Sequence, residues 1–131
     1  KHVDLLFANE MELKALFETE DFAAALDMIK PIVKIAAITR YSRGSVVVNG
    51  RVKIFVEAEP VKPETVVDST GAGDLYAAGF LFGLVNKRSL GTCAMIGGIA
   101  ASEIISHYGA RPEVSLRGFV RNKLLQYGKR F

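Results

Sequence analysis

Residues 66–79, VVDSTGAGDLYAAG, are the stretch of sequence that decides the fold. β-forming residues lead into two glycines separated by an alanine, and an acidic residue and small apolar residues follow. This order predicts a glycine turn and then a helix over residues 74–85. The apolar residues of that helix recur at roughly helical spacing, as Leu75, Ala78, Phe82 and Val85.

The glycine turn has the chemistry of an anion site. The first N–H groups of a helix have no partner within it, and the helix dipole adds positive partial charge there. We therefore expect the amides of Gly71, Ala72 and Gly73 to hold a phosphate, which the glycines allow to approach closely. Asp74 would lie beside this anion, where a carboxylate is useful if it accepts the proton of an attacking hydroxyl. The structural alternative is a plain loop whose first-turn acid complements the dipole.

Two common phosphate-binding motifs are absent. Tyr76 occupies the place of the third glycine of the dinucleotide-binding fingerprint, so that motif fits poorly. The Gly-Lys-Ser or Gly-Lys-Thr of a Walker A loop does not occur anywhere in the chain. A phosphate bound at the glycine turn would therefore belong to another family of sites.

The N-terminal part of the chain predicts alternating strands and helices. Apolar runs at residues 3–7 and 34–39 have the composition of strands, and the second lacks the alternation of a half-exposed strand. Asn9 followed by Glu12 has the spacing of a capping box and predicts a helix after the first strand. A second helical pattern follows Asp21. Its apolar members are Phe22, Leu26, Ile29 and Val33.

The rest of the chain predicts a hairpin and further helices. Asn49-Gly50 between valine-rich runs indicates a hairpin with a type I′ turn, antiparallel on an otherwise parallel sheet. Helices are expected at residues 89–107, where Gly97-Gly98 permits a close neighbour, and at residues 115–127. The fold class is α/β: a mostly parallel sheet flanked by helices, with an antiparallel hairpin.

Composition excludes several function classes. Of the 131 residues, 17 are basic and 14 acidic, and this net charge of +3 does not make a nucleic-acid surface by itself. No apolar run is long enough to span a membrane, and a lone cysteine, Cys93, fits a reducing cytoplasm. The chain begins at Lys1 with a strand following at once, which we interpret as a piece of a longer protein.

Residues 68–74, DSTGAGD, resemble the C-terminal signature of the ribokinase-like (PfkB) carbohydrate and nucleoside kinases. Asn9 and Glu12 resemble the family's Asn-x-x-Glu motif, and residues 39–44 lie where the family has Thr-x-Gly-x-x-Gly. Gly109 resembles a glycine that closes the adenine-side helix. Order and spacing agree along the whole chain. The similarity is closest to the bacterial adenosine-kinase-like branch, through residues 7–10, 77–83 and 105–112.

The resemblance implies roles for the residues of the glycine turn. Asp74 corresponds to the catalytic base that takes the proton of the acceptor hydroxyl. The amides of Gly71, Ala72 and Gly73 correspond to the anion hole for the charge that develops on the transferred phosphoryl, and Gly73 also counts among the ATP contacts. Both roles agree with the chemistry expected from the residues alone.

The same resemblance implies ATP and metal contacts elsewhere. Asn9 and Glu12 organise phosphates and Mg²⁺, with Glu12 acting through water. Further ATP contacts fall on Thr39, Arg40, Gly44 and Gly109. Tyr41 departs from the family pattern, which usually has glycine there, and so changes the expected path of this loop. Asp68 and the carbonyl of Thr70 match positions that bind an activating K⁺ in many relatives.

Residues 1–131 are thus expected to be the C-terminal, ATP-binding portion of a PfkB-type kinase, a larger fold whose N-terminal half and lid are absent. The parent would transfer the γ-phosphoryl of ATP, with Mg²⁺, to a hydroxymethyl group of a sugar or nucleoside, adenosine first and ribose or another sugar next. We expect no nucleic-acid or membrane partner, and a homodimer of the parent stays open. The alternative is a non-catalytic nucleotide-binding or interaction module that lacks an acceptor site.

Overall fold

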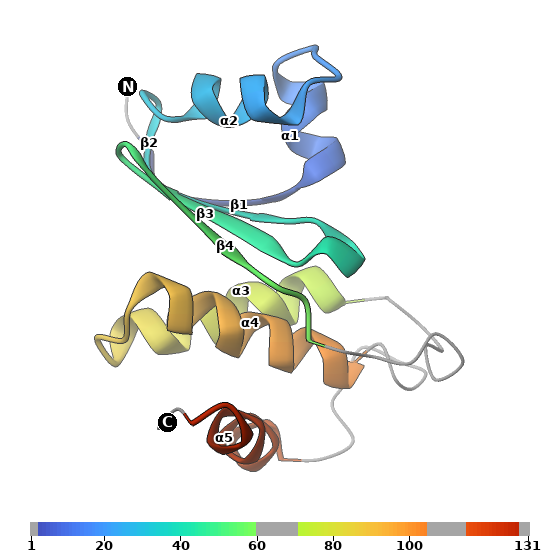
Figure 1. Cartoon of the computed structure of the whole chain (residues 1–131), viewed down its shortest axis with the longest axis vertical. Coiled ribbons are helices and arrows are strands. Elements are labelled where there is room, and N and C mark those ends of the chain that lie inside the picture. Colours follow the sequence, from blue (N-terminus) through green and yellow to red (C-terminus); the bar gives the residue numbers. More distant parts are fainter. Residues whose placement is uncertain (1–2, 60–70, 105–114, 129–131) are drawn as a thin grey trace. The chain divides into compact units, whose positions relative to one another are not determined.

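A computed structural model of the chain describes residues 3–59, 71–104 and 115–128, which fall into two compact units. The N-terminal unit, Lys1–Ala58, contains β1 (Val3–Asn9), α1 (Glu10–Leu16), α2 (Phe22–Ile29), β2 (Val33–Thr39), the short 3-10 turn η1 (Tyr41–Arg43), β3 (Ser45–Asn49) and β4 (Val52–Val56). The C-terminal unit, Glu59–Phe131, contains α3 (Ala72–Val85), α4 (Leu90–Ile104) and α5 (Leu116–Gln126), as labelled in Figure 1.

The four strands form one mixed sheet in the order β1-β2-β3-β4. β1 and β2 are parallel, with Asn9 opposite Thr39 at their carboxyl ends, whereas β2–β3 and β3–β4 are antiparallel. The α/β class and the antiparallel hairpin are therefore confirmed. Among the described strands, only β1 and β2 are parallel. Parallel neighbours need a long crossover connection, and the segment with α1 and α2 is the only such connection between the described strands.

The hairpin turn lies one residue later than expected. Asn49 still pairs with Val52, so the loop residues are Gly50 and Arg51. A type I′ turn needs positive φ at both loop residues, but only Gly50, at φ 60°, has it. The type I′ prediction is therefore wrong, and glycine at the first loop position matches the requirement of a type II′ turn instead.

The helix after Asp21 is shorter than its apolar pattern indicated. Asp21 caps α2 by accepting a hydrogen bond from the Ala24 N–H at 3.2 Å, as expected of an N-cap. Val33, however, opens β2 and pairs with Val3. Pro31 explains the early end, because proline lacks the N–H that a continuing helix requires.

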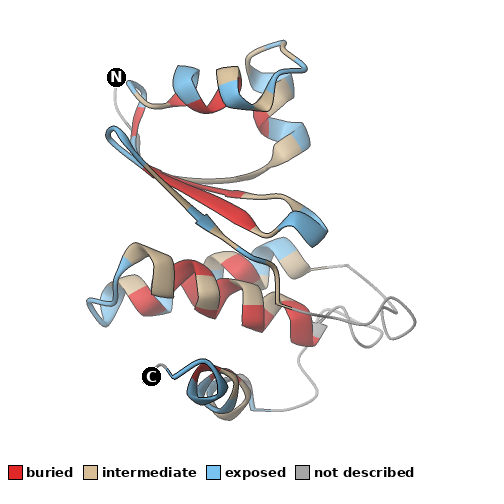
Figure 2. Ribbon diagram, in the orientation of Figure 1, coloured by how far each residue is buried: buried red, intermediate tan, exposed pale blue. Residues whose placement is uncertain are grey.

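α1 and α2 pack on one face of the sheet within the N-terminal unit (Figure 1). The helices contribute Leu13, Leu26 and Ile29, each at most 2% exposed. The strands contribute side chains two residues apart, such as Val46 and Val48, because alternate residues of a strand share a face. Figure 2 shows these buried stretches in red.

α3 and α4 pack closely through glycines in the C-terminal unit. A Cβ on Gly79 would lie 2.9 Å from the Gly97 Cα, and a Cβ on Gly97 would lie 2.7 Å from the Tyr76 carbonyl oxygen. A Cβ on Gly98 would meet nothing within 4 Å, so only the first glycine of the pair serves the close approach. Glycines at these two positions let the backbones of α3 and α4 approach each other closely, so the two helices pack tightly.

α5 completes the C-terminal unit by packing Val120 and Leu124 against Ile96 and Ile99 of α4. The helix expected at residues 115–127 is confirmed as α5, and Ser115 caps it by accepting a hydrogen bond from the Gly118 N–H. The expected extension of α4 to residue 107 lies outside the described residues. None of the helices in the described ranges combines the length and apolar character needed to cross a bilayer.

Candidate active site

The start of α3 is built from backbone rather than from side chains. Gly71 is the N-cap and adopts φ 81°, ψ 0°, a left-handed conformation that glycine accepts at little cost. The first helical hydrogen bond runs from the Leu75 N–H to the Gly71 carbonyl at 3.0 Å. No side chain caps this end among the described residues. The amides of Ala72, Gly73 and Asp74 thus precede the first helical bond and carry the positive end of the dipole.

Gly73 and Asp74 are exposed in the first turn of α3. A Cβ on Gly73 would meet no described atom within 4 Å, so packing among these residues does not require glycine there. Close approach of an anion to the backbone does require it, which agrees with the predicted anion hole. The exposed Asp74 carboxylate also complements the dipole, so the structural alternative and the catalytic role are compatible.

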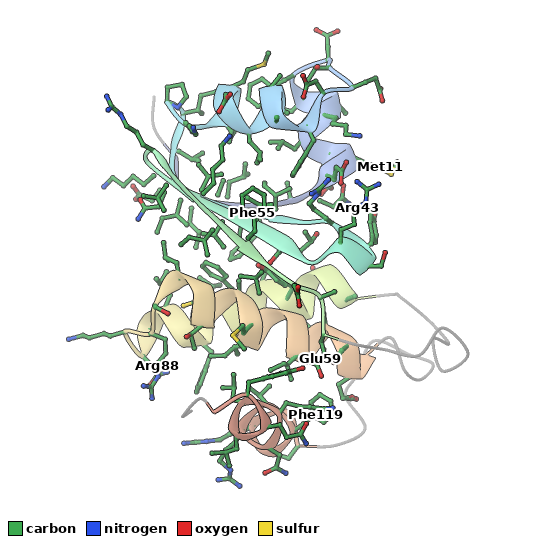
Figure 3. All side chains as sticks on the ribbon, viewed as in Figure 1. Met11, Arg43, Phe55, Glu59, Arg88 and Phe119 are labelled. Atoms are coloured by element: carbon green, nitrogen blue, oxygen red, sulfur yellow. The ribbon has the colours of Figure 1, made fainter. Side chains whose placement is uncertain are left out.

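The carboxyl ends of β1 and β2 form a second group of predicted site residues. Asn9 and Thr39 lie opposite each other at these ends, because the two strands are parallel and in register. Asn9 and Glu12 form the expected capping box: the Asn9 N–H donates to Glu12 Oε1, and the Glu12 N–H donates to Asn9 Oδ1, both at 2.8 Å. In Figure 3, Met11 and Arg43 mark the helix and the turn that follow the two strands.

The turn after β2 depends on Gly44. The Arg40 N–H donates to the Gly44 carbonyl at 2.7 Å, and Gly44 adopts φ 84°. A Cβ there would lie 1.9 Å from the Val56 carbonyl oxygen, so no larger residue fits without moving the backbone. Tyr41 adopts φ 54°, the left-handed region that favours glycine. The tyrosine therefore accepts a strained conformation at the position where the family has glycine.

Arg40 is held by side chains from both helices of the N-terminal unit. Its Nε donates to Glu10 Oε1 at 2.9 Å, and its Cζ lies 4.0 Å from the centroid of the Phe22 ring. Glu10 Oε2 also pairs with Lys14 Nζ at 3.1 Å. The hydrogen bond from Arg40, partly opposed by burial, holds the pKa of Glu10 below its usual value.

Sequence reasoning missed this role of Glu10, although a signal existed. Glu10 directly follows Asn9, and Arg40 directly follows Thr39. Residues that follow the ends of two paired parallel strands are neighbours in space, which brings an acidic and a basic side chain together. Reading the strand ends as a pair, rather than one motif at a time, predicts the contact.

The structure thus groups the predicted residues in two places. Asn9, Glu12, Thr39, Arg40 and Gly44 gather at one edge of the sheet in the N-terminal unit. The residues of the anion hole gather at the start of α3 in the C-terminal unit, namely Gly71, Ala72, Gly73 and Asp74. The remaining predicted residues, Asp68, Thr70 and Gly109, lie outside the described residues.

The residues present fit ATP phosphates and a hydrated Mg²⁺. The start of α3 offers backbone amides to a phosphate, as described above. Glu12 is exposed and uses Oε1 for its cap, which suits a carboxylate that holds Mg²⁺ through water. The described part of the chain has no cluster of three or more His, Cys, Asp or Glu side chains that could enclose a metal ion by itself.

Comparison with known proteins decides the family. The model of the pfkB family carbohydrate kinases matches residues 1–116. The chain belongs to this family. Over 92% of its length it superimposes on the adenosine kinase of Sinorhizobium meliloti with a TM-score of 0.88 and 49% identity. It superimposes over 96% of its length on a probable sugar kinase of Rhizobium etli, with a TM-score of 0.87 and 42% identity.

A sequence relative is the cytidine kinase of Thermococcus kodakarensis, 36% identical over 108 residues and 82% of this chain. The chain spans only 38% of that kinase, and 36% of each of the two superimposed structures. The comparisons confirm a pfkB-family kinase portion with the ribokinase-like α/β fold, related to both nucleoside and sugar kinases.

Proposed function

We propose that this chain is the C-terminal, ATP-binding portion of a kinase that transfers the γ-phosphoryl of ATP to a hydroxymethyl group of a nucleoside or sugar. Adenosine is the first candidate for the acceptor, since the adenosine kinase of S. meliloti is 49% identical. Ribose or another sugar is the second, in view of the sugar kinase of R. etli. The observation that carries the proposal is the start of α3, where uncapped backbone amides adjoin an exposed carboxylate.

The residues at the start of α3 act by positioning and by charge. Asp74 accepts the proton of the acceptor hydroxyl. As this proton leaves, the hydroxyl oxygen forms a bond to the γ-phosphorus, and the bond between that phosphorus and the bridging oxygen of ADP breaks. The amides of Gly71, Ala72 and Gly73 stabilise the negative charge on the phosphoryl oxygens during the transfer. A carboxylate is a sufficient base because phosphoryl transfer depends mostly on alignment and electrostatics.

The N-terminal unit serves the nucleotide in this proposal. Asn9 and Glu12 would hold the phosphates and a hydrated Mg²⁺, and the ion would offset the negative charge of the phosphates. Thr39, Arg40 and Gly44 belong to the turn that would serve the nucleotide. Gly109, which lies outside the described residues, is a further nucleotide-binding residue in this proposal. Asp68 and the Thr70 carbonyl, outside the described residues, would bind K⁺ in the same proposal.

The acceptor contacts come from sequence beyond these residues. The chain spans 36–38% of the length of the three relatives named above, and in this proposal it carries the phosphoryl-transfer motifs. We therefore expect the 131 residues by themselves to phosphorylate no acceptor efficiently, whereas the longer kinase does. Efficient turnover by the 131 residues alone would contradict this division.

The test is Asp74→Asn in the complete polypeptide that carries these residues, assayed by ADP release with adenosine and ribose. Loss of a general base lowers kcat by about 100-fold or more and leaves the KM for ATP within about threefold. Asp21→Asn is the matched control, because it makes the same change at another exposed helix start, where asparagine caps equally well. Full activity of Asp74→Asn refutes the role of Asp74. ATP binding without transfer by the unmutated protein favours the non-catalytic module instead.

A further inference from the structure

The guanidinium of Arg40 is held on two sides by the protein itself. Its side chain is 18% exposed, with Nε on Glu10 at 2.9 Å and the guanidinium over the Phe22 ring at 4.0 Å. A hydrogen bond to a carboxylate and a contact with an aromatic face both restrict the guanidinium, and together they fix its plane. A guanidinium held in this way cannot turn freely toward a bound phosphate.

The backbone of Arg40 anchors the turn that follows β2. The Arg40 N–H donates to the Gly44 carbonyl at 2.7 Å, and the Arg40 carbonyl accepts from the Arg43 N–H at 3.0 Å. The same turn contains Tyr41 at φ 54°. A strained residue of this kind persists only where the surrounding structure holds it in place. The backbone bonds of Arg40 to Gly44 and Arg43, and the bond from the Gly44 N–H to the Tyr41 carbonyl at 3.1 Å, close the turn around Tyr41.

We propose that Glu10 and Phe22 hold Arg40 as a positioning residue, which fixes the 40–44 turn for ATP, and that Arg40 does not bind the phosphates itself. The inference rests on the proposed ATP-binding function and deepens it. Glu10 follows Asn9 directly, so the same contact ties the turn to the segment that begins with the Asn9–Glu12 capping box. The nucleotide side of the N-terminal unit is thereby held as one piece.

Glu10→Gln separates this role from direct phosphate binding, because only the positioning role predicts weaker binding of MgATP in this variant. If Arg40 positions the turn, loss of the Glu10 charge loosens the turn, and the Kd for MgATP rises by about tenfold. If Arg40 binds phosphate directly, loss of its competing carboxylate leaves the Kd unchanged or lowers it. MgATP binding is measured by calorimetry on the complete polypeptide.

A second variant approaches Arg40 from its other side. Phe22→Leu keeps an apolar side chain against the core but removes the aromatic face under the guanidinium, so the Kd rises in the same direction by about threefold. Arg40→Lys loses both the planar fork and the stacking, and we expect it to behave like Glu10→Gln. In the Arg40→Lys background, Glu10→Gln has little further effect on the Kd, because both variants break one interaction.

Lys14→Met is the matched control. Lys14 contacts the other oxygen of Glu10 at 3.1 Å from the same helix, so its loss weakens α1 without touching Arg40. We expect its Kd for MgATP to match that of the unmutated protein. Hydrogen exchange at the amides of Arg40, Arg43 and Gly44 gives a readout without ATP: exchange is about tenfold faster in Glu10→Gln and unchanged in Lys14→Met.

The outcomes separate the inference from the function on which it rests. Weaker MgATP binding and faster exchange in Glu10→Gln, with Lys14→Met unchanged, support the positioning role. Unchanged or tighter binding in Glu10→Gln overturns it, whether or not that variant is less stable. If the unmutated protein binds no MgATP, the proposed function fails first, and the ATP part of this inference fails with it.

Discussion

Gly44→Ala tests how the turn at the nucleotide side is built. A Cβ at this position would lie 1.9 Å from the Val56 carbonyl oxygen, and 2.8 Å from the Ala58 backbone nitrogen. All of the obstructing atoms are backbone, so relief requires movement of the chain after β4. In addition, φ 84° is unfavourable for a residue with a side chain.

The expected loss can be assembled from these two effects. The left-handed conformation costs about 1–2 kcal/mol, and forcing an extra carbon into a packed site adds about 1–3 kcal/mol. We therefore expect Gly44→Ala to lower the free energy of unfolding by about 2–5 kcal/mol. Urea unfolding of the complete polypeptide, followed by circular dichroism, measures this loss.

Gly50→Ala is the matched control for the backbone effect. Gly50 also has positive φ, at 60°, but a Cβ there would meet nothing within 4 Å. Its substitution therefore costs only the conformational share, about 1–2 kcal/mol. Equal losses for the two variants would refute the steric reasoning, because the difference between them isolates the clash with the backbone after β4.

Three further outcomes follow from particular residues. In urea unfolding, Gly97→Ala lowers the free energy of unfolding by about 1–3 kcal/mol, because the new Cβ meets Tyr76. Gly98→Ala raises it by up to about 1 kcal/mol, because a Cβ there meets nothing within 4 Å and alanine favours a helix. The reverse order of stability would contradict the packing of α3 on α4. The pKa of Glu10 is lowered, so its ionised form adds to the free energy of unfolding above pH 4.5, the ordinary pKa of the group. This advantage over Glu10→Gln is lost as the pH falls through the lowered pKa. A difference in free energy of unfolding that does not change with pH would contradict this reasoning. Gly73→Ala leaves the free energy of unfolding unchanged or slightly higher, because its Cβ would meet no described atom within 4 Å. The same Cβ would obstruct a bound phosphate, so kcat falls at least about tenfold. Unchanged turnover would argue against the anion hole.

Local signals in the sequence predicted most of the elements. Asn9 caps its helix as expected, because a side chain that bonds an N–H three residues on acts within one turn. Asp21 and Ser115 cap the helices that were predicted to begin at these positions. The hairpin was predicted from an equally local signal, the Asn-Gly pair, although the turn lies one residue later than expected. Val33 was misassigned because one apolar residue fits helical and strand spacing equally well, and the proline before it decided the matter.

The interactions that hold the candidate site were harder to predict because they join distant segments. The Glu10–Arg40 ion pair spans 30 residues, and it exists only because β1 and β2 are parallel and in register. The need for glycine at position 44 comes from the backbone of residues 56–58, which no local pattern contains. The glycine turn at the start of α3 was predictable, because its chemistry depends on consecutive residues.

The most direct test of the central claim is the single-turnover rate of phosphoryl transfer, measured by rapid quench in the complete polypeptide and in Asp74→Asn. This measurement observes the chemical step apart from binding and product release. We expect the rate of transfer from ATP to the acceptor to fall by about 100-fold or more in Asp74→Asn while the Kd for ATP is retained. Equal single-turnover rates in the two proteins would show that Asp74 is not the base.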